Sequence, residues 1–313
     1  MIEGRVLVTG ATGFVGRRLV QDLLDHGAGV RILNYGPLPI PDTWRNRVEI
    51  RDGDLTSPRS LDGLAAGIQT VFHLAGEIRR PDLFDAVNRQ GTENLLEACQ
   101  AEGVRRFLYM SSVGVMGAGP RGGIVDERSP ERPRNAYERS KLGGERIALS
   151  YHTKGGVSVT VLRPSIIYGE GKDPAGDGFF SLLRSIRSGR FVLFGEKFIS
   201  SYVYVGDVVA AALLLANHPR AGGEEFIVNE PVPLRDFIDE ISANFGRGKV
   251  RALPTPLGAL CARMISLTGR FGSLYNQTSF SMAKLRNIGF TPPFGYREGL
   301  KRTISAYGAL LGG

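Results

Sequence analysis

The sequence predicts an α/β fold, a doubly wound parallel sheet with a smaller C-terminal lobe. A buried apolar strand, a glycine-rich turn and an amphipathic helix open the chain. Short apolar runs then alternate with helical patterns as far as residue 228, which is typical of a parallel sheet with helices on both faces. From Pro231 onward, prolines interrupt short amphipathic helices. The expected division is a sheet domain at residues 1–168, to which strands near 201–229 return, and a lobe at residues 169–200 and 230–313.

The glycine-rich turn connects the first apolar strand to the first helix. Gly10, Gly13 and Gly16 stand at three-residue spacing between an apolar run at residues 6–8 and a helical pattern at residues 17–24. Glycine permits a tight turn, a close approach of backbone to ligand and close packing of helix on strand. The N–H groups and dipole at the helix N-terminus attract anions. We therefore predict that this turn binds the pyrophosphate of a dinucleotide.

Apolar patterns place the other elements. Residues 37–47 hold three prolines and the only tryptophan, Trp44, and are expected to form a loop or an irregular helix start. His73 lies inside an apolar run, so we expect a hydrogen-bonded core histidine there. The remaining strands are expected at residues 29–33, 48–50, 70–76, 106–112, 157–163, 201–205 and 225–228, with helices at 179–190 and 208–216.

The composition restricts the partners of the chain. Its 313 residues carry a net charge of +8, which suits an anionic ligand such as a nucleotide. Basic residues do not interleave with aromatic ones in blocks, so no nucleic acid is expected. The most apolar run, residues 208–216, is too short to cross a bilayer. The apolar stretch 257–267 is interrupted by Arg263 and suits a core or subunit contact better than a lipid surface.

Cysteine and histidine usage indicates a reducing compartment and no metal. Cys99 and Cys261 are far apart and outside any CxxC pattern, and Cys99 is expected in the core. Without a disulfide framework or a recognisable signal peptide, we expect a cytoplasmic protein. None of the four histidines has metal-ligand spacing, so no metal is expected; they are His26, His73, His152 and His218.

The end of the second predicted strand leaves the choice of dinucleotide open. Nicotinamide enzymes of this layout carry an acid about 20 residues beyond the glycines to bind the ribose 2′-OH. This chain has Asn34 there, followed by Tyr35, and neither selects NAD or NADP. Arg17 and Arg18 lie in the first turn of the first helix, the unfavourable end for cations. We interpret them as a solvated pair, with an NADP 2′-phosphate as the alternative partner.

Tyr137, Lys141 and Ser112 form the candidate catalytic group. Tyr137 and Lys141 are four residues apart and share one face of a predicted helix. A tyrosine ionises near pH 10, but a neighbouring ammonium and a nicotinamide cation favour its phenolate. Tyr137 could then accept a proton from a substrate hydroxyl while a hydride leaves the same carbon. Ser112, at the end of the fifth strand, would hydrogen-bond the same oxygen.

These motifs together resemble the short-chain dehydrogenase/reductase superfamily, in particular its extended branch of sugar-nucleotide enzymes with a Rossmann fold. The matching phrases are TGATGFVG at residues 9–16, GDL at 53–55, FHLAG at 72–76, VNRQGT at 87–92, YERSK at 137–141 and RPSIIYG at 163–169. The resemblance implies NAD, with NADP as the alternative, and a homodimer through helices at 88–101 and 137–151. It also implies cofactor contacts from Gly10, Thr12, Gly13, Phe14, Val15, Gly16, Asn34, Asp54, Leu55, Leu74, Ala75, Gly76, Met110, Tyr137, Lys141, Pro164 and Ile167.

Three positions depart from the resemblance. Met116 stands where relatives carry a tyrosine, and Ile166 where nucleotide-sugar enzymes carry an asparagine that meets the substrate diphosphate. Ser200 stands near the position of their diphosphate-binding arginine. Neither Ile166 nor Ser200 can bind an anion with comparable strength. Other cations could take that role, and their positions suggest Arg184, Arg187, Arg190 or Lys197.

The leading functional hypothesis is an NAD(P)-dependent nucleotide-sugar 4-epimerase or 4-ketoreductase, with a small-molecule substrate that is a nucleotide sugar. The first alternative is an NADP-dependent reductase or dehydrogenase of an apolar carbonyl or hydroxysteroid-like compound, because the RPSIIYG phrase also resembles that branch. The second is a non-catalytic dinucleotide-binding protein, against which the intact group of Ser112, Tyr137 and Lys141 argues.

Overall fold

The structure is a computed structural model that describes residues 4–36, 39–117, 119, 123–195, 198–253 and 278–311. The expectations for Lys197, for Cys261 and for the apolar stretch at 257–267 lie outside the described residues.

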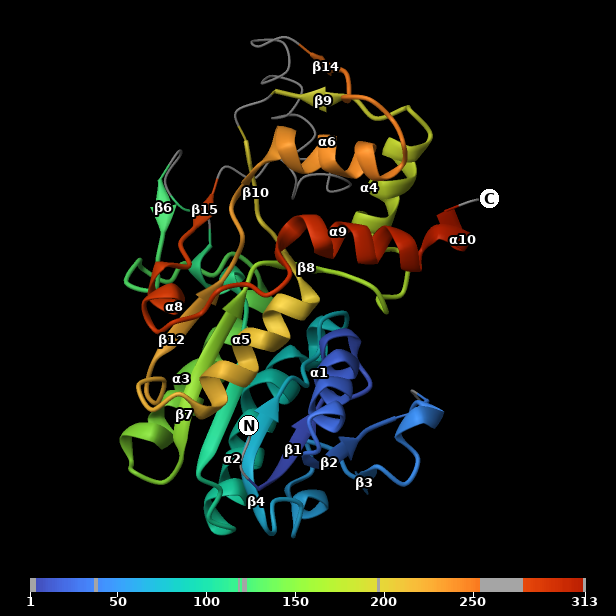
Figure 1. Ribbon diagram of the computed structural model, residues 1–313. Helices are drawn as coiled ribbons and strands as arrows, with labels where there is room; N and C mark the ends of the chain where they lie inside the picture. The colour runs from blue at the N-terminus through green and yellow to red at the C-terminus, as the bar shows by residue number, and fades with distance from the viewer. Residues whose placement is uncertain are drawn as a thin grey trace.

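A parallel seven-stranded sheet forms the centre of the molecule, in the order β12-β7-β5-β4-β1-β2-β3 (Figure 1). The predicted doubly wound α/β fold is therefore confirmed. The strand order reverses between β1 and β4, and in open sheets of this kind ligands bind beside that point at the carboxyl ends of the strands. The strands are β1 (Arg5–Thr9), β2 (Gly29–Asn34), β3 (Val48–Asp52), β4 (Ile68–His73), β5 (Arg106–Met110), β7 (Ser158–Pro164) and β12 (Glu225–Val228).

Helices cover both faces of the sheet, as the near-continuous apolar strands require. Val6 and Val8 of β1 belong to the core beneath α1 (Phe14–Asp25) and α5 (Val205–Asn217), whereas Leu7 belongs to the opposite core. That opposite core packs against α2 (Gly91–Ala101) and α3 (Ala136–Thr153). Cys99 is fully buried in it, as expected. Shorter helical turns lie at Asp42–Trp44, Pro58–Leu61, Pro81–Leu83, Ala86–Gln90 and Val113–Met116.

Three predicted strands differ in extent or in pairing. The fourth ends at His73 and the fifth at Met110, so the segments Leu74 to Gly76 and Ser111 to Ser112 are loops at the carboxyl edge. The strand expected at 201–205 is β11 (Tyr202–Tyr204), which pairs with β8 (Ile166–Tyr168) in a separate two-stranded sheet. Only β12 of the expected later strands joins the main sheet among the described residues.

A second group of elements lies over the carboxyl edge of the sheet, at the top of Figure 1. Its core is rich in aromatic side chains, including Phe179, Tyr202 and Phe237, and it also contacts Phe14 and Val15 at the start of α1. The lobe therefore closes over the end of the glycine turn. Its elements are α4 (Gly178–Arg187), β9 (Leu193–Phe194), β10 (Ile199–Ser200), β13 (Val232–Pro233), α6 (Leu234–Asn244), β14 (Ala252–Leu253), α9 (Gly295–Ala306) and α10 (Gly308–Leu311).

A third, smaller group joins the lobe to the sheet. The strand β6 (Ile124–Val125) pairs in parallel with β15 (Ser279–Phe280), and α8 (Ala283–Asn287) follows and packs on β12. The segment after Ser112 is thereby held against the second half of the chain. No helix among the described ranges is both long and apolar enough to span a membrane.

Candidate active site

The glycine turn has the backbone shape that its spacing predicts. Gly10 has φ +69°, a conformation that favours glycine, and a Cβ added there would lie 2.6 Å from the backbone nitrogen of Ala75. A Cβ at Gly16 would overlap the carbonyl oxygen of Gly10, so the helix touches the turn at this point. A Cβ at Gly13 would lie 3.2 Å from the same oxygen. Side chains at these three glycines would fill the space along the turn, which we call the cradle. Their absence leaves the backbone of the cradle open to a ligand.

The N-terminus of α1 is left free for an anion. Gly13 is the capping residue, no side chain caps the helix, and its first turn contains no acid. Its free N–H groups and positive dipole therefore face the cradle. The residues present thus fit the diphosphate of a dinucleotide.

The two arginines in this first turn are occupied by protein groups. Arg17 donates from Nε to the carbonyl of Thr12 (2.9 Å) and from Nη2 to that of Pro39 (3.5 Å). Arg18 forms ion pairs with Asp22 (2.8 Å) and with Glu170 of the lobe (3.1 Å). The interpretation as a solvated pair is wrong, because both guanidinium groups tie the helix to neighbouring loops.

Asp52 of the neighbouring strand β3 places its carboxylate beside the end of β2. Asn34 is paired in register with Asp52 of β3, and its Nδ2 donates to Asp52 Oδ1 at 2.7 Å. Sequence spacing along β2 could not reveal this acid, because Asp52 is 18 residues away and becomes a neighbour only through strand pairing.

The GDL turn after β3 contains two predicted cofactor contacts, and it leaves one half-buried and the other buried. Asp54 Oδ1 accepts from the backbone N–H and the hydroxyl of Thr56, both at 2.8 Å, which fixes the turn. The side chain of Leu55 is buried in the core, and its carbonyl accepts from Asn94 Nδ2 (2.8 Å). Asp54 can offer a side-chain oxygen to a ligand, whereas Leu55 can contribute only backbone.

A chain of neutral hydrogen bonds fixes the loop after β4. The N–H of Ala75 donates to Thr9 Oγ1 (3.3 Å), and Thr9 Oγ1 lies 2.7 Å from His73 Nδ1. On the other side of the ring, Nε2 lies 3.1 Å from Thr92 Oγ1, which donates to the carbonyl of Asn88 (2.7 Å). Since the Thr92 hydroxyl proton is used there, Nε2 carries the proton and Nδ1 accepts from Thr9. His73 is the buried, satisfied core histidine that the sequence predicts, and burial lowers its pKa to about 3.

Asn88 extends this chain to the helix that carries Tyr137 and Lys141. It lies in a π-helical turn (Ala86–Gln90), a feature often found at functional sites. Its Oδ1 accepts from Glu77 N–H (2.8 Å), and its Nδ2 donates to Glu77 O (3.0 Å) and to Ser140 Oγ (2.9 Å). Ser140 in turn donates to the carbonyl of Tyr137 (2.8 Å). In the sequence Asn88 is only part of the VNRQGT phrase, and its link to α3 appears only in the fold.

Ser112 lies beside the first turn of α3. Its Oγ accepts from Gly114 N–H at 3.1 Å, which leaves the hydroxyl proton available. A Cβ added at Gly114 would lie 3.3 Å from Ser112 Oγ and 3.0 Å from Cγ of Glu138, the residue after Tyr137. The first turn of α3 is held by Asn135, whose side chain accepts from Glu138 N–H (2.8 Å). The loop after β5 and the start of α3 are therefore in contact.

Lys141 reaches the loop after β4. A Cβ added at Gly76 would lie 3.8 Å from Lys141 Nζ, and this ammonium lies 4.3 Å from the ring centre of Tyr109. Lys141 is buried, and burial lowers its pKa to about 8, although the carboxylate of Glu145 opposes the shift. Tyr137 contacts the ring of Phe84 edge-on (5.7 Å between centroids).

The ionisation of Tyr137 differs from the expectation. Burial raises the pKa of its phenol, and the carboxylate of Glu138 adds to the increase. The lowering expected from Lys141 is not present in the protein alone, because desolvation dominates. The positive charge of an oxidised nicotinamide would act in the opposite direction.

The other predicted cofactor contacts line the same edge. Met110 ends β5 and packs against the core that includes Val8. Pro164 ends β7, paired in register with Val228 of β12. Ile167 lies in β8 and its carbonyl accepts from Lys172 Nζ (3.4 Å). The structure thus brings residues from the ends of β1, β4, β5 and β7 to one edge, and their contacts with a cofactor stay a prediction.

The two positions that depart from the diphosphate-binding pattern, Ile166 and Ser200, are both shielded by the lobe. Ser200 is 1% exposed, and its Oγ lies 3.4 Å from the N–H of Tyr202. Ile166 is half-buried and packs against the aromatic core of the lobe. Arg184 and Arg187 occupy the last turn of α4, which packs against α6 and α10 at the outer side of the lobe (Figure 1). Within the described ranges, no group of His, Cys, Asp and Glu could hold a metal ion.

Comparison with known proteins agrees with this geometry. A sequence model of the NAD dependent epimerase/dehydratase family matches residues 6–229. A 3 beta-hydroxysteroid dehydrogenase/Delta 5-->4-isomerase of Mycobacterium tuberculosis is 32% identical, over 98% of this chain and 91% of that protein. An N-acetyl-alpha-D-glucosaminyl-diphospho-ditrans,octacis-undecaprenol 4-epimerase of Escherichia coli O157:H7 is 30% identical, over 97% and 95%. The solved UDP-glucose 4-epimerase of Thermus thermophilus, in complex with NAD, superposes with a TM-score of 0.75 at 27% identity, over 97% and 98%.

Proposed function

The chain belongs to the NAD-dependent epimerase/dehydratase family, the extended branch of short-chain dehydrogenases/reductases, and from this membership we propose that it oxidises a secondary alcohol with NAD. The observation that carries the proposal is the meeting of Lys141 with the loop after β4, one helical turn from Tyr137. NAD, when bound, accepts a hydride and can return it. The cradle of Gly10, Gly13 and Gly16 would hold its diphosphate.

Three side chains would bind the substrate hydroxyl or take part in the transfer of its proton. Ser112, with its hydroxyl proton free, would hydrogen-bond the reacting oxygen. Tyr137 would remove the hydroxyl proton and give it back when the hydride returns. Lys141 would favour the phenolate of Tyr137 by its charge and would donate hydrogen bonds to the ribose of the cofactor. Asn88 would hold the loop after β4 and α3 in a fixed relation, so that the three groups keep their places.

We propose a nucleotide sugar as the first substrate candidate and 4-epimerisation or 4-keto reduction as its reaction. Support comes from the similarity, over nearly the whole chain, to 4-epimerases of a diphospho-linked and of a UDP-linked sugar. The net charge of +8 also suits an anionic substrate. A homodimer through α2 and α3 belongs to the same proposal.

An apolar secondary alcohol such as a hydroxysteroid is the second candidate. Ser200 is buried and Ile166 packs against aromatic side chains, so neither can bind a diphosphate. The similarity to a hydroxysteroid dehydrogenase supports the same candidate. At these two positions the chain therefore offers an apolar side chain and a buried hydroxyl instead of an anion-binding side chain.

One experiment distinguishes the two substrate candidates and tests the catalytic role of Tyr137. The purified protein is incubated with NAD and either UDP-sugars or a 3β-hydroxysteroid. Absorbance reports reduced nicotinamide, and chromatography reports epimers. An epimerase forms a new sugar with no net nicotinamide reduction, whereas a dehydrogenase accumulates reduced cofactor. Tyr137→Phe should lower turnover at least about 100-fold with NAD still bound, and Tyr151→Phe on the same helix should not. Full activity of Tyr137→Phe would refute the proposed acid–base role.

The choice of dinucleotide gives a further check. Asp52 beside Asn34 would repel the 2′-phosphate of NADP, and both arginines of the first turn of α1 have other partners. We expect Asp52→Asn to improve binding of NADP relative to NAD by roughly tenfold, measured by calorimetry. Equal preference in the variant and the parent protein would exclude a role for Asp52.

A further inference from the structure

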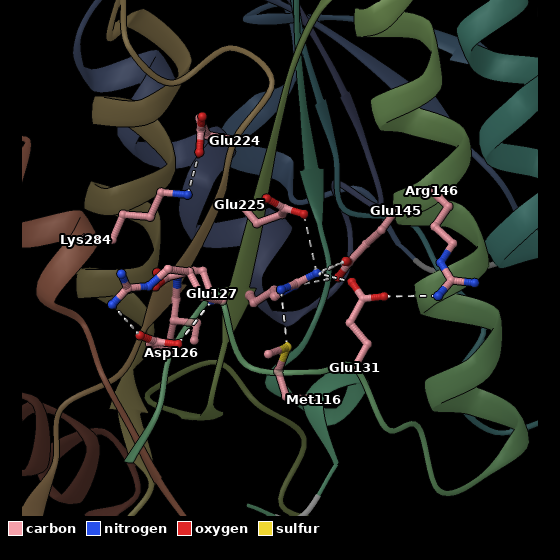
Figure 2. A network of polar contacts seen from close by, with 12 residues as sticks. Met116, Asp126, Glu127, Glu131, Glu145, Arg146, Glu224, Glu225 and Lys284 are labelled. Carbon is pink, nitrogen blue, oxygen red and sulfur yellow. Dashed lines mark hydrogen bonds and ion pairs between the residues drawn. The ribbon is translucent and has the colours of Figure 1, made fainter.

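Acidic side chains surround the buried Arg163 of β7, and Figure 2 labels them as Glu131, Glu145 and Glu225. Arg163 is 1% exposed, and its Nε donates to both oxygens of Glu145, each at 3.1 Å. Its Nη2 also pairs with Glu145 and with Glu131 (2.9 Å), and its Nη1 contacts Met116 Sδ (3.2 Å). Glu225 of β12 lies 3.8 Å away. None of the acids in this cluster takes part in the proposed hydride transfer.

Glu145 lies on the same face of α3 as the proposed catalytic residues. Tyr137, Lys141 and Glu145 follow one another at four-residue intervals, so each is one helical turn from the next. Lys141 and Glu145 are both buried, with Glu145 1% exposed. A charge interaction one turn away is therefore weakly screened by water.

The surroundings of Lys141 make the Glu145 carboxylate the effective counter-charge. Tyr109 of β5 presents a neutral ring to Nζ, and His73 of β4 is neutral because burial lowers its pKa to about 3. On the loop after β4, Glu77 is paired with Arg80 (3.1 Å). On the π-helical turn packed against α3, Arg89 is paired with Asp85 (2.7 Å). From β7, Arg163 is paired with Glu145 itself.

Arg163 explains how an acid can stay charged in this place. Burial raises the pKa of Glu145, and the hydrogen bonds and charge of Arg163 oppose that shift. A buried carboxylate without such a partner would take up a proton. The guanidinium also fixes the carboxylate in a bidentate geometry, which holds its position along the helix.

We propose that Glu145, held by Arg163, is a positioning residue that keeps Lys141 protonated for its work on Tyr137 and the cofactor. This inference rests on the proposed function only for the role of Lys141. It assigns to the buried pair an electrostatic task beyond joining β7 to α3. Glu131 provides the contrast, because it pairs with the same arginine from a loop and does not share the helix face of Lys141.

The experiment measures the protonation of Lys141 directly. Protein labelled at the ε-carbon of lysine is titrated by NMR, and the signal that disappears in Lys141→Met identifies Lys141. The parent chain is compared with Glu145→Gln and with the matched variant Glu131→Gln. The pH dependence of kcat/KM and of NAD binding is recorded for the same three proteins.

We expect Glu145→Gln to move the titration of Lys141 to lower pH by roughly half a unit to one unit. The alkaline limbs of kcat/KM and of NAD affinity should move in the same direction. Glu131→Gln should leave all three within about 0.2 units. An unchanged Lys141 titration in Glu145→Gln, or an equal shift in Glu131→Gln, would overturn the proposal while leaving the proposed function intact.

A second variant covers the case in which Glu145→Gln does not fold. Glu145→Leu combined with Arg163→Met removes both charges, a change that buried pairs often tolerate. The shift of Lys141 toward lower pH should persist in it, and a titration like that of the parent chain would overturn the proposal. A shifted titration with an unmoved kcat/KM profile would refute the role of Lys141, and the inference would fail together with the proposed function.

Discussion

Two polar networks reach α3 from different parts of the sheet, and they are built differently. The first runs from Thr9 through His73, Thr92 and Asn88 to Ser140, and every group in it is neutral. The second runs from β7 and β12 through Arg163 to Glu145 and consists of charges (Figure 2). Both end on the helix that carries Tyr137 and Lys141.

The difference between the networks indicates a division of tasks. Neutral hydrogen bonds act only at contact distance and depend on direction, so the first network fixes where the loop after β4 lies relative to α3. Charges act beyond contact when they are buried, so the second can influence a group one helical turn away. If this division is right, breaking the first should affect geometry and breaking the second should affect stability and ionisation.

The largest expected effect comes from breaking the charged network on one side. Arg163→Met leaves buried Glu145 without its partner and should lower the free energy of unfolding by about 3–5 kcal/mol. The double variant with Glu145→Leu should recover most of that loss. Arg146→Met is the control, because Arg146 also pairs with Glu131 but is 70% exposed, and it should cost less than about 1 kcal/mol. Urea unfolding measures all three, and a double variant no more stable than Arg163→Met would contradict the prediction.

The two networks are the part of the site that the sequence could predict least. The glycine turn and the Tyr137–Lys141 pair are visible because their chemistry depends on spacings of three and four residues. His73 and Thr9 are 64 residues apart, and Arg163 and Glu145 are 18 apart on different elements. Such partners are set by strand order and helix packing, which short-range patterns do not contain.

The fold itself was largely predictable, because its strands do leave short-range patterns in the sequence. Buried parallel strands are continuous apolar runs, so the strands of the main sheet, β1 to β5, β7 and β12, appear in the sequence. The two-stranded pairing of β11 with β8 and the burial of Ser200 depend on the lobe, whose segments are short and distant in sequence. Asp52 became a neighbour of Asn34 through register alone.

The second prediction breaks the neutral network at its junction. Asn88→Ala removes the bonds to Glu77 and Ser140 together and should lower kcat about 100-fold through misplacement of the catalytic groups. Asn94→Ala is the matched control, since Asn94 is a nearby buried amide whose Nδ2 donates to Leu55 O, on the GDL turn, instead of to a residue of α3. Asn94→Ala should destabilise the protein with kcat nearly unchanged. Equal losses of kcat in both variants would mean that Asn88 has no special place in the site.

The third prediction uses the neutrality of His73. Its pKa is about 3 in the folded protein and about 6.5 when unfolded, so the unfolded chain binds an extra proton below pH 6.5. Stability from this group is therefore complete above that pH and is lost as the pH falls. Between pH 7 and pH 5 the loss should be about 2 kcal/mol.

Urea unfolding at several pH values measures this loss. His73→Gln should lose the corresponding part of the pH dependence, while His26→Gln, at an exposed histidine, should keep the parent slope. A parent slope in His73→Gln would show that His73 is not held neutral.

The smallest expected effect tests the last bond of the neutral network. Ser140→Ala removes one acceptor for Asn88 and should cost about 1 kcal/mol of unfolding free energy. Ser150→Ala is the control, because Ser150 Oγ donates to Ile147 O (2.7 Å) three residues back on α3, as Ser140 Oγ donates to Tyr137 O. The two serines share that local bond, and only Ser140 joins it to another element. A larger fall of kcat in Ser140→Ala than in Ser150→Ala would therefore show that the neutral network supports catalysis through the bond between Asn88 and Ser140. Equal falls would show that Ser140 contributes only to the stability of the helix.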